Sequence, residues 1–224
     1  GKLVALSNNY SGVALGNYNI IDQAVSYAAI TPKAVTLSGI TATDKTYDGS
    51  TAAAVSLSGA SISGLISGDL IALSAAGAFA DKNAGTGKTV TLFNSFGGAD
   101  ANNYSIANQS STTASIAKKS VTLTGVTAAD KAYDGTTLSN ISGGSIVGLI
   151  GGDAVTSNTT GSFANKNAGV NKTVSLVSNF SGADAGNYDV TAPLSTTASI
   201  TPKAISLSGV AAADKTYDGT VVAS

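Results

Sequence analysis

The side chains of this 224-residue sequence that could do chemistry are aspartate, lysine, tyrosine, serine and threonine. Histidine, cysteine, arginine, glutamate, methionine and tryptophan are absent. Without histidine or cysteine there is no imidazole base, no thiolate nucleophile and no ordinary zinc or iron site. Without arginine there is no bidentate phosphate clamp, and a formal net charge of −1 gives no basic surface for nucleic acid. We therefore expect no enzyme activity, no cofactor, no metal site and no nucleic-acid partner.

One motif, Lys-x-Tyr-Asp-Gly, occurs three times and supplies the candidate site. Its tyrosines could form a sugar-binding platform, because tyrosine offers a flat apolar face with a polar rim. The structural alternative is a hairpin turn at Asp-Gly, with tyrosine in the core and lysine on the neighbouring surface. We favour this alternative, since every repeat must fold while not every repeat must bind. The residues are Lys45, Tyr47, Asp48, Gly49, Lys131, Tyr133, Asp134, Gly135, Lys215, Tyr217, Asp218 and Gly219.

Two further motifs resemble ligand sites and are interpreted as turns. Gly85-Thr86-Gly87-Lys88-Thr89 resembles the end of a phosphate-binding loop, but the first glycine of that pattern is replaced by Lys82, so we predict a hairpin turn. Asp44 with Asp48, or Asp100 near Asn102 and Asn103, could make a weak calcium site at best. Aspartate and asparagine are also preferred in tight turns, which is our interpretation.

Lysine and asparagine or aspartate recur at fixed positions of the two repeats, at Lys82/Asn83, Lys166/Asn167 and Asp81/Asn165. Such pairs could form an intramolecular isopeptide bond, but that reaction usually needs a buried carboxylic acid that is held neutral. Neighbours in the sequence cannot be the bonded pair. An exposed turn is the prediction here.

The elements that position these residues follow from an internal repeat. Tyr47, Tyr133 and Tyr217 are 86 and 84 residues apart, and so are the Asn-Tyr pairs that end at Tyr18, Tyr104 and Tyr188. We divide the chain into the C-terminal part of a truncated repeat (1–31), complete repeats at 32–117 and 118–201, and the N-terminal part of a truncated repeat (202–224).

About 85 residues suffice for a small core, whereas the two partial repeats are too short to own one. We expect the partial repeats to be ordered by strand addition to the flanking repeats or to other copies. No flexible linker separates the repeats, and Thr-Pro-Lys stands at 31–33 and 201–203. Proline fixes φ and favours an extended predecessor, so we expect a rigid rod. Val35–Ile40 could begin its own repeat or complete the sheet of the preceding one.

Within a repeat, apolar residues alternate with polar ones, as in Val35-Thr36-Leu37-Ser38 and Thr89-Val90-Thr91-Leu92. This period of two predicts strands. We expect five or six short strands per repeat, in mixed order. Residues 62–70 have the only spacing suited to one helical turn. The predicted fold class is all-β or nearly all-β, as a tandem array of domains of about 85 residues.

An ordered series of motifs over nearly the whole chain resembles the YDG repeat, related to the mostly-β-grasp (MBG) repeats of giant bacterial surface adhesins. The series is Lys-x-Tyr-Asp-Gly-Thr/Ser, Gly-Leu-Ile-x-Gly-Asp, Phe-Ala-Asp/Asn-Lys-Asn-Ala-Gly, Lys-Thr-Val and Ala-Asp-Ala-x-Asn-Tyr, closing on Thr-Pro-Lys-Ala. The first partial repeat departs from this series, because it has Ala14-Leu15 where the first complete repeat has Asp100-Ala101. This departure weakens any ligand role for Asp100.

The resemblance implies a β-grasp-like fold and an extracellular, filamentous-haemagglutinin-like exoprotein on the bacterial cell surface, exported by an outer-membrane two-partner secretion transporter. The repeats would then be structural spacers in an adhesin or biofilm-matrix filament, contacting adjacent repeats and projecting a distal binding region. Alternatively, the repeats themselves would bind exopolysaccharide or other adhesin copies as weak multivalent modules. An exposed tyrosine pair in a groove of every repeat would indicate binding, and buried tyrosines would indicate a spacer.

Overall fold

The alternating sequence pattern produces strands that bury every second side chain. Val35 and Leu37 are buried on β3 (Lys33–Ser38), and Val90 and Leu92 are buried on β10 (Gly85–Gly97). The computed structural model, which describes residues 1–222, is nearly all-β, as this pattern predicts. The helices of the described chain are three short 3-10 turns, and none of them is long and apolar enough to cross a membrane. They are η1 (Leu15–Asn17), η2 (Ala101–Asn103) and η3 (Ala185–Asn187).

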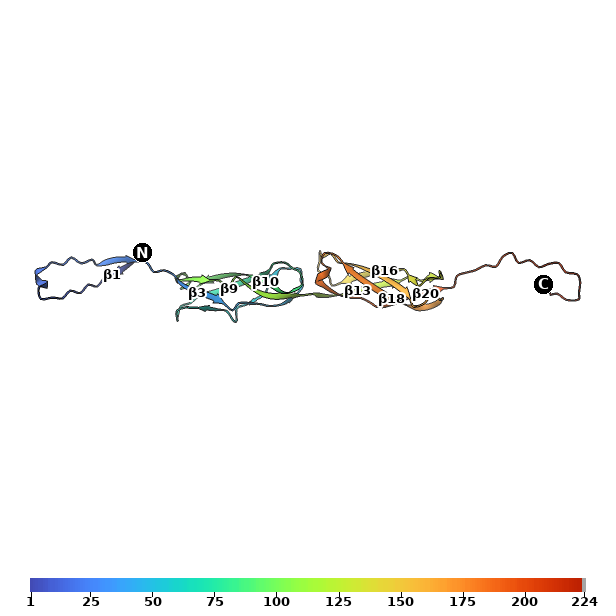
Figure 1. Cartoon of the computed structure of the whole chain (residues 1–224), viewed down its shortest axis with the longest axis horizontal. Helices are drawn as coiled ribbons and strands as arrows, with labels where there is room; N and C mark the ends of the chain where they lie inside the picture. Colours follow the sequence, from blue (N-terminus) through green and yellow to red (C-terminus); the bar gives the residue numbers. More distant parts are fainter. Residues whose placement is uncertain (223–224) are drawn as a thin grey trace. The chain divides into compact units, whose positions relative to one another are not determined.

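The chain divides between Ala117 and Lys118 into two compact units, and each contains one complete repeat. The first repeat has a five-stranded sheet of order β5-β12-β10-β9-β6, a three-stranded sheet of order β11-β3-β8, and the pair β4–β7. Its central strands β9 and β10 lie side by side in Figure 1. The remaining strands are β4 (Thr41–Ala42), β5 (Lys45–Thr46), β6 (Ala52–Ala53), β7 (Val55–Ser56), β8 (Ser61–Ser63), β9 (Ala72–Phe79), β11 (Tyr104–Ala107) and β12 (Ser111–Ala117).

The second repeat has the same topology in fewer, longer strands. Its sheets have the orders β14-β20-β18-β17-β15 and β16-β13-β19, and β13 covers in one strand the positions that β3 and β4 cover in two. Both repeats contain more than the predicted five or six strands, because short edge segments pair separately. The strands are β13 (Lys119–Ala128), β14 (Lys131–Ala132), β15 (Leu138–Ser139), β16 (Ile141–Val147), β17 (Thr156–Phe163), β18 (Gly169–Ser181), β19 (Tyr188–Thr191) and β20 (Ser195–Thr201).

Parallel and antiparallel pairs are mixed within each repeat, as predicted. The first strand of a repeat, β3 or β13, pairs in parallel with β11 or β19. The next edge strand, β5 or β14, pairs in parallel with the last strand, β12 or β20. The boundary segment Val35–Ile40 therefore begins its own repeat, since β3 pairs with strands of that repeat only.

The apolar core lies on the inner face of the five-stranded sheet. In the second repeat it consists of Phe163, Val174, Leu176, Ala198 and Ile200, all of them at most 6% exposed. Partly buried side chains, including those of Tyr133 and Ile141, pack against this cluster. The equivalents of the same positions in the first repeat, such as Phe79 and Val90, are also buried.

The partial repeats behave differently from the expectation. β1 (Lys2–Ala5) pairs with β2 (Val25–Ala28), and its register Lys2↔Ala28 reproduces Lys88↔Ala114 of the first repeat. Among the described strands β1 and β2 have no other partner, and 202–222 contains no strand. The predicted strand addition to flanking repeats is therefore wrong. The hairpin closes locally, whereas the equivalents of 202–222, β13 and β14, need partners from the end of their own repeat.

Residues 62–70, the segment whose spacing was suited to one helical turn, do not form a helix. The chain leaves β8 and forms a turn that Asp69 N closes by donating to Ile66 O at 3.2 Å. The next amide, Leu70 N, donates to the Asp100 carboxylate at 2.9 Å. Because that carboxylate takes the donor a helix would use, the segment does not continue as a helix.

Candidate functional site

The signature turn, which we define as residues 45–50 and the equivalent 131–136 and 215–220, starts on an edge strand of the five-stranded sheet. Strand alternation places Lys45 and Tyr47 on the inner face and Thr46 outside. Tyr47 N donates to Ala117 O at 2.8 Å, which extends the pairing of β5 with β12. The Tyr47 side chain is 2% exposed, so it belongs to the core and offers no platform to a ligand.

The Asp48 carboxylate organises the turn that follows Tyr47. Its Oδ1 accepts hydrogen bonds from Lys45 Nζ at 2.8 Å and from Ser50 N and Ser50 Oγ at 2.9 Å each. Gly49 between them has φ of +79°, a conformation that glycine adopts without steric cost. The lysine hydrogen bond and then the Ser50 backbone hydrogen bond lower the pKa of Asp48 to about 2, so the carboxylate stays ionised.

The Lys45 ammonium is used within the turn. It donates to Ser50 O at 2.8 Å and Ser50 Oγ at 3.1 Å in addition to Asp48, and it lies 5.7 Å from the centroid of the Phe79 ring. A cation over an aromatic face is attracted by the ring quadrupole. The Lys45 side chain is only 18% exposed. The prediction that this lysine lies on the neighbouring surface is therefore wrong, because its three donors have acceptors inside the repeat.

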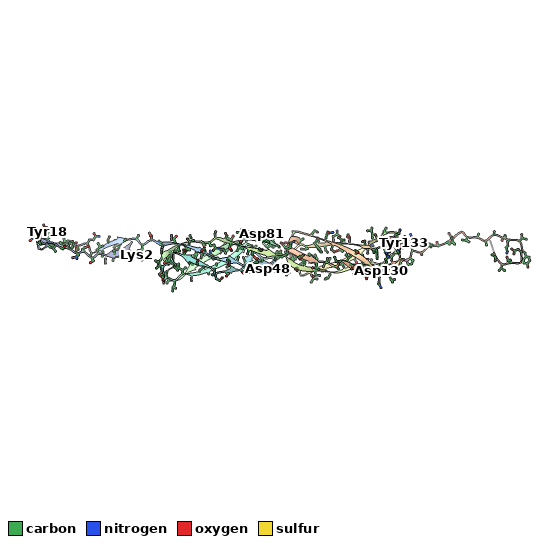
Figure 2. All side chains as sticks on the ribbon, turned by 60° about the horizontal axis from the view of Figure 1, so that its bottom comes forward. Lys2, Tyr18, Asp48, Asp81, Asp130 and Tyr133 are labelled. Atoms are coloured by element: carbon green, nitrogen blue, oxygen red, sulfur yellow. The ribbon has the colours of Figure 1, made fainter. Side chains whose placement is uncertain are left out.

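The second repeat repeats this arrangement, and Figure 2 labels Tyr133 there. Lys131 Nζ donates to Asp134 Oδ1 at 2.9 Å, to Thr136 O at 3.0 Å and to Leu138 O at 2.8 Å. It lies 5.7 Å from the Phe163 ring centroid. The pKa of Asp134 is again lowered to about 2, first by Lys131 and then by the Thr136 amide.

The third signature turn separates local from tertiary causes. Lys215 Nζ donates to Asp218 Oδ1 at 2.8 Å and to Thr220 Oγ1 at 2.7 Å, as in the complete repeats. Tyr217, however, is 92% exposed. The polar turn therefore forms from six consecutive residues alone, whereas burial of the tyrosine needs the strands of a whole repeat.

The signature turn is not the predicted hairpin turn. In a hairpin the two flanking strands pair with each other, but β5 pairs with β12 and β6 pairs with β9, at opposite edges of the five-stranded sheet. Only residues 47–51 join these edges. The sheet must therefore curl until its edges approach, and the Lys45–Asp48–Ser50 hydrogen bonds stabilise the connection between them.

A second polar turn lies beside the signature turn, and Figure 2 shows Asp48 and Asp81 at the same end of the first repeat. Lys82 Nζ is 5.8 Å from the Tyr47 ring centroid. Asp81 Oδ1 accepts from Lys88 Nζ at 2.5 Å and from Asn83 N at 2.8 Å. Lys88 follows a β-bulge inside β10, so the predicted hairpin turn at Gly85–Thr89 is wrong.

The lysines of this turn contact aspartate or asparagine side chains other than the sequence neighbours considered above. These contacts are Lys88 with Asp81 and, in the second repeat, Lys172 with Asn165 at 2.7 Å. Lys88 lowers the pKa of Asp81, first through its hydrogen bond. Amide formation needs the opposite shift toward a neutral acid. The Lys88–Asp81 contact is an ion pair in which only the aspartate is exposed, and it lies in a turn, in agreement with the turn interpretation.

The aspartates considered for calcium hold backbone amides. Asp44 Oδ1 accepts from Ser115 N at 2.6 Å, and Asp100 Oδ2 accepts from Leu70 N at 2.9 Å. Asp130 and Asp184 make the same contacts in the second repeat. Within residues 1–222 no three carboxylates gather in a way that could hold a metal ion. These side chains therefore fix loops to strands.

A tyrosine–aspartate pair outside the signature escaped the sequence analysis. The Tyr104 hydroxyl donates to Asp69 Oδ2 at 2.5 Å and accepts from Ile66 N at 3.1 Å, and Tyr188 does the same with Asp153 and Ile150. Burial first, and then the Asp69 hydrogen bond, raise the pKa of Tyr104. The sequence feature that could have indicated this pair is the separation of 35 residues between the aspartate and the tyrosine, which is the same in both repeats.

The lowered carboxyl pKa values predict that stability falls in acid. An unfolded aspartate has a pKa of about 3.9, whereas that of folded Asp134 is about 2. The folded state therefore binds fewer protons in this window, so the contribution of Asp134 is complete above pH of about 4 and is lost as the pH falls toward about 2. Urea titrations at pH 5 and pH 2.5 test this. Between these two pH values the free energy of unfolding should fall less in Asp134→Asn than in the parent. For Asp189→Asn, at an exposed position on β19, the free energy of unfolding should fall as much as in the parent.

The sequence comparisons agree with this repeated architecture. Two consecutive segments, residues 31–114 and 117–198, match the YDG domain. No curated protein and no solved structure matches the chain significantly. The two matches cover most of the chain, and each contains one signature turn with its buried or half-buried tyrosine. The chain therefore belongs to the YDG domain family, of which it contains two domains in tandem.

Proposed function

We propose that these YDG domains are structural spacers in an extracellular bacterial adhesin or biofilm-matrix filament. In this role they separate a distal binding region from the cell surface and contact chiefly the adjacent repeats of their own chain. The proposal includes export of the full-length protein by an outer-membrane two-partner secretion transporter. The absence of histidine, cysteine and arginine, and the low content of charged side chains, fit a role that needs little chemistry.

The observation that carries the proposal is the internal use of the signature side chains. Tyr47 is buried, and the Lys45 and Asp48 charges are paired within the turn. A binding platform would need these groups at the surface in every repeat. A spacer instead uses them to stabilise its own fold, because the same small fold must be stable many times over in one chain. The alternative, in which the signature binds exopolysaccharide, has no exposed tyrosine pair to rest on in either complete repeat.

Small-angle X-ray scattering of the 224-residue chain tests the spacer proposal. One residue, Lys118, separates β12 from β13, and flexible linkers are usually much longer. We therefore expect a narrow range of inter-domain angles and a pair-distance distribution with an extended tail. A chain with three Gly-Ser pairs inserted after Ala117 should lose this rigidity and serves as the control. A bell-shaped distribution from the parent, or scattering equal to that of the control, would contradict a rigid spacer.

A further inference from the structure

A hollow of about 310 Å³ lies in the first unit, between residues 30–33, 66–69 and 102–104. Its apolar wall is formed by Ile30, Pro32 and Ile66, and two of these, Ile30 and Ile66, are 81% and 52% exposed. Asp69, Asn102 and Asn103 line the hollow beside this wall. Ligand sites in proteins combine an apolar surface with a few convergent polar groups in this way, from about 300 Å³ upward.

Two polar side chains of the hollow, Asn102 and Asn103, differ from the aspartates of the repeat that are used to hold turns. Asp44, Asp48, Asp81 and Asp100 are all bound to backbone amides of their own repeat. The exposed side chains of Asn102 and Asn103, in contrast, make no hydrogen bond within the part of the chain that the structure describes.

Asp69 is positioned rather than mobile. One of its carboxylate oxygens, Oδ2, accepts from the buried Tyr104 hydroxyl at 2.5 Å, and the other has no hydrogen-bond donor in the described chain. The hydroxyl is itself held by the Ile66 amide. This pair of hydrogen bonds fixes the orientation of the carboxylate in the wall of the hollow, so that its second oxygen is pre-organised for a ligand.

The polar side chains and the aliphatic wall of the hollow together indicate which class of ligand it could bind. Two carboxamides offer both donors and acceptors, and a carboxylate offers acceptors, which together suit the adjacent hydroxyl groups of a sugar. The C–H face of a pyranose ring suits the aliphatic wall. Asp69 disfavours an anionic sugar, and Lys33 is the single cation among the lining residues. We propose that this hollow binds one residue of a neutral polysaccharide, an activity that adds to the spacer role and does not depend on it.

The second repeat provides an internal comparison. Asn102 is replaced there by Gly186, and the equivalent of Asn103, Asn187, is 3% exposed and has a partner inside the protein. The carboxamide pair is therefore a property of the first repeat. Binding should be confined to that repeat, unlike the signature turn, which occurs in both.

Nuclear magnetic resonance of the ¹⁵N-labelled 224-residue chain tests the proposal, with cellotetraose, mannotetraose and chitotetraose as separate probes. We expect at least one of them to bind with a dissociation constant on the order of 1 mM and to shift the amides of residues 66–69 and 102–104. The amides of 150–153 and 186–188 should not move. Tetragalacturonate, the anionic probe, should shift neither set.

Asn102→Gly reproduces the residue of the second repeat and should weaken binding about tenfold without changing the rest of the spectrum. Asn158→Ala, which removes an exposed carboxamide on β17, should bind as the parent does. The proposal is overturned if none of the neutral probes shifts residues 66–69 and 102–104, if both repeats respond equally, if Asn102→Gly binds like the parent, or if tetragalacturonate binds more tightly than the neutral probes. None of these outcomes bears on the scattering test, so a failure here leaves the spacer proposal intact.

Discussion

Replacing Tyr47 with alanine is expected to lower the free energy of unfolding of the first repeat by about 3–5 kcal/mol. The side chain is 2% exposed, and its removal leaves a cavity between the signature turn and the core. A domain of this size has a total stability of only about 5–15 kcal/mol, so the repeat should unfold at clearly lower urea concentration. Urea titration followed by tyrosine fluorescence and by NMR measures the effect separately from the second repeat.

Two matched substitutions make the result specific. Tyr47→Phe keeps the ring and should cost less than about 1.5 kcal/mol. Tyr217→Ala removes the same residue type from a position that is 92% exposed and should change stability by less than about 0.5 kcal/mol. Parent-like unfolding of Tyr47→Ala together with loss of attachment to polysaccharide would mean that the signature is a binding site, and the spacer proposal would be wrong.

Replacing Gly182 with alanine should destabilise the second repeat by about 2–4 kcal/mol. Gly182 has φ of +126°, and a Cβ atom there would lie 2.2 Å from the carbonyl oxygen of Ala154. This close approach is needed because Asp184 N donates to the same oxygen at 3.2 Å, while the Asp184 carboxylate binds Ala154 N at 2.9 Å. An added methyl group would separate these partners.

The control for this substitution lies four residues along the same loop. Apart from the adjacent backbone, no atom lies within 4 Å of the position that a Cβ of Gly186 would take, and its φ is not in the positive region. Gly186→Ala should therefore change the urea midpoint very little. If Gly182→Ala has an equally small effect, the contact between this loop and Ala154 does not form as described.

The sequence pattern was sufficient to predict the strands and the core. Alternation at Val35/Leu37 and Val90/Leu92 identified buried positions, and the repeat offset identified their equivalents. The burial of Tyr47 was favoured for another reason, because the signature occurs in every repeat and every repeat must fold. The buried strand positions depend on neighbours in the sequence, which is why local periodicity was enough to identify them.

The pairing of strands was not predictable in the same way. Asp48-Gly49 is a strong local signal for a tight turn, but whether the flanking strands pair depends on β9 and β12, which are far along the chain. The Lys45 contact with Phe79 and the Tyr104 contact with Asp69 are non-local for the same reason. The hollow beside Asn102 requires three separate segments, so composition alone could not indicate it.

The parallel pairing of the first strands of each repeat with its last strands has a kinetic consequence. Asp44 and Ser115, joined by a hydrogen bond, are 71 residues apart, and Asp130 and Ser199 are 69 apart. Such contacts give a high contact order and slow, all-or-none folding, because a long loop must close before these pairs form. A chain that emerges from one end cannot complete the sheet until the closing strand is out. Folding of the tandem array should therefore advance in steps of one whole domain. During the proposed export, each folded domain would be too large to return through the transporter.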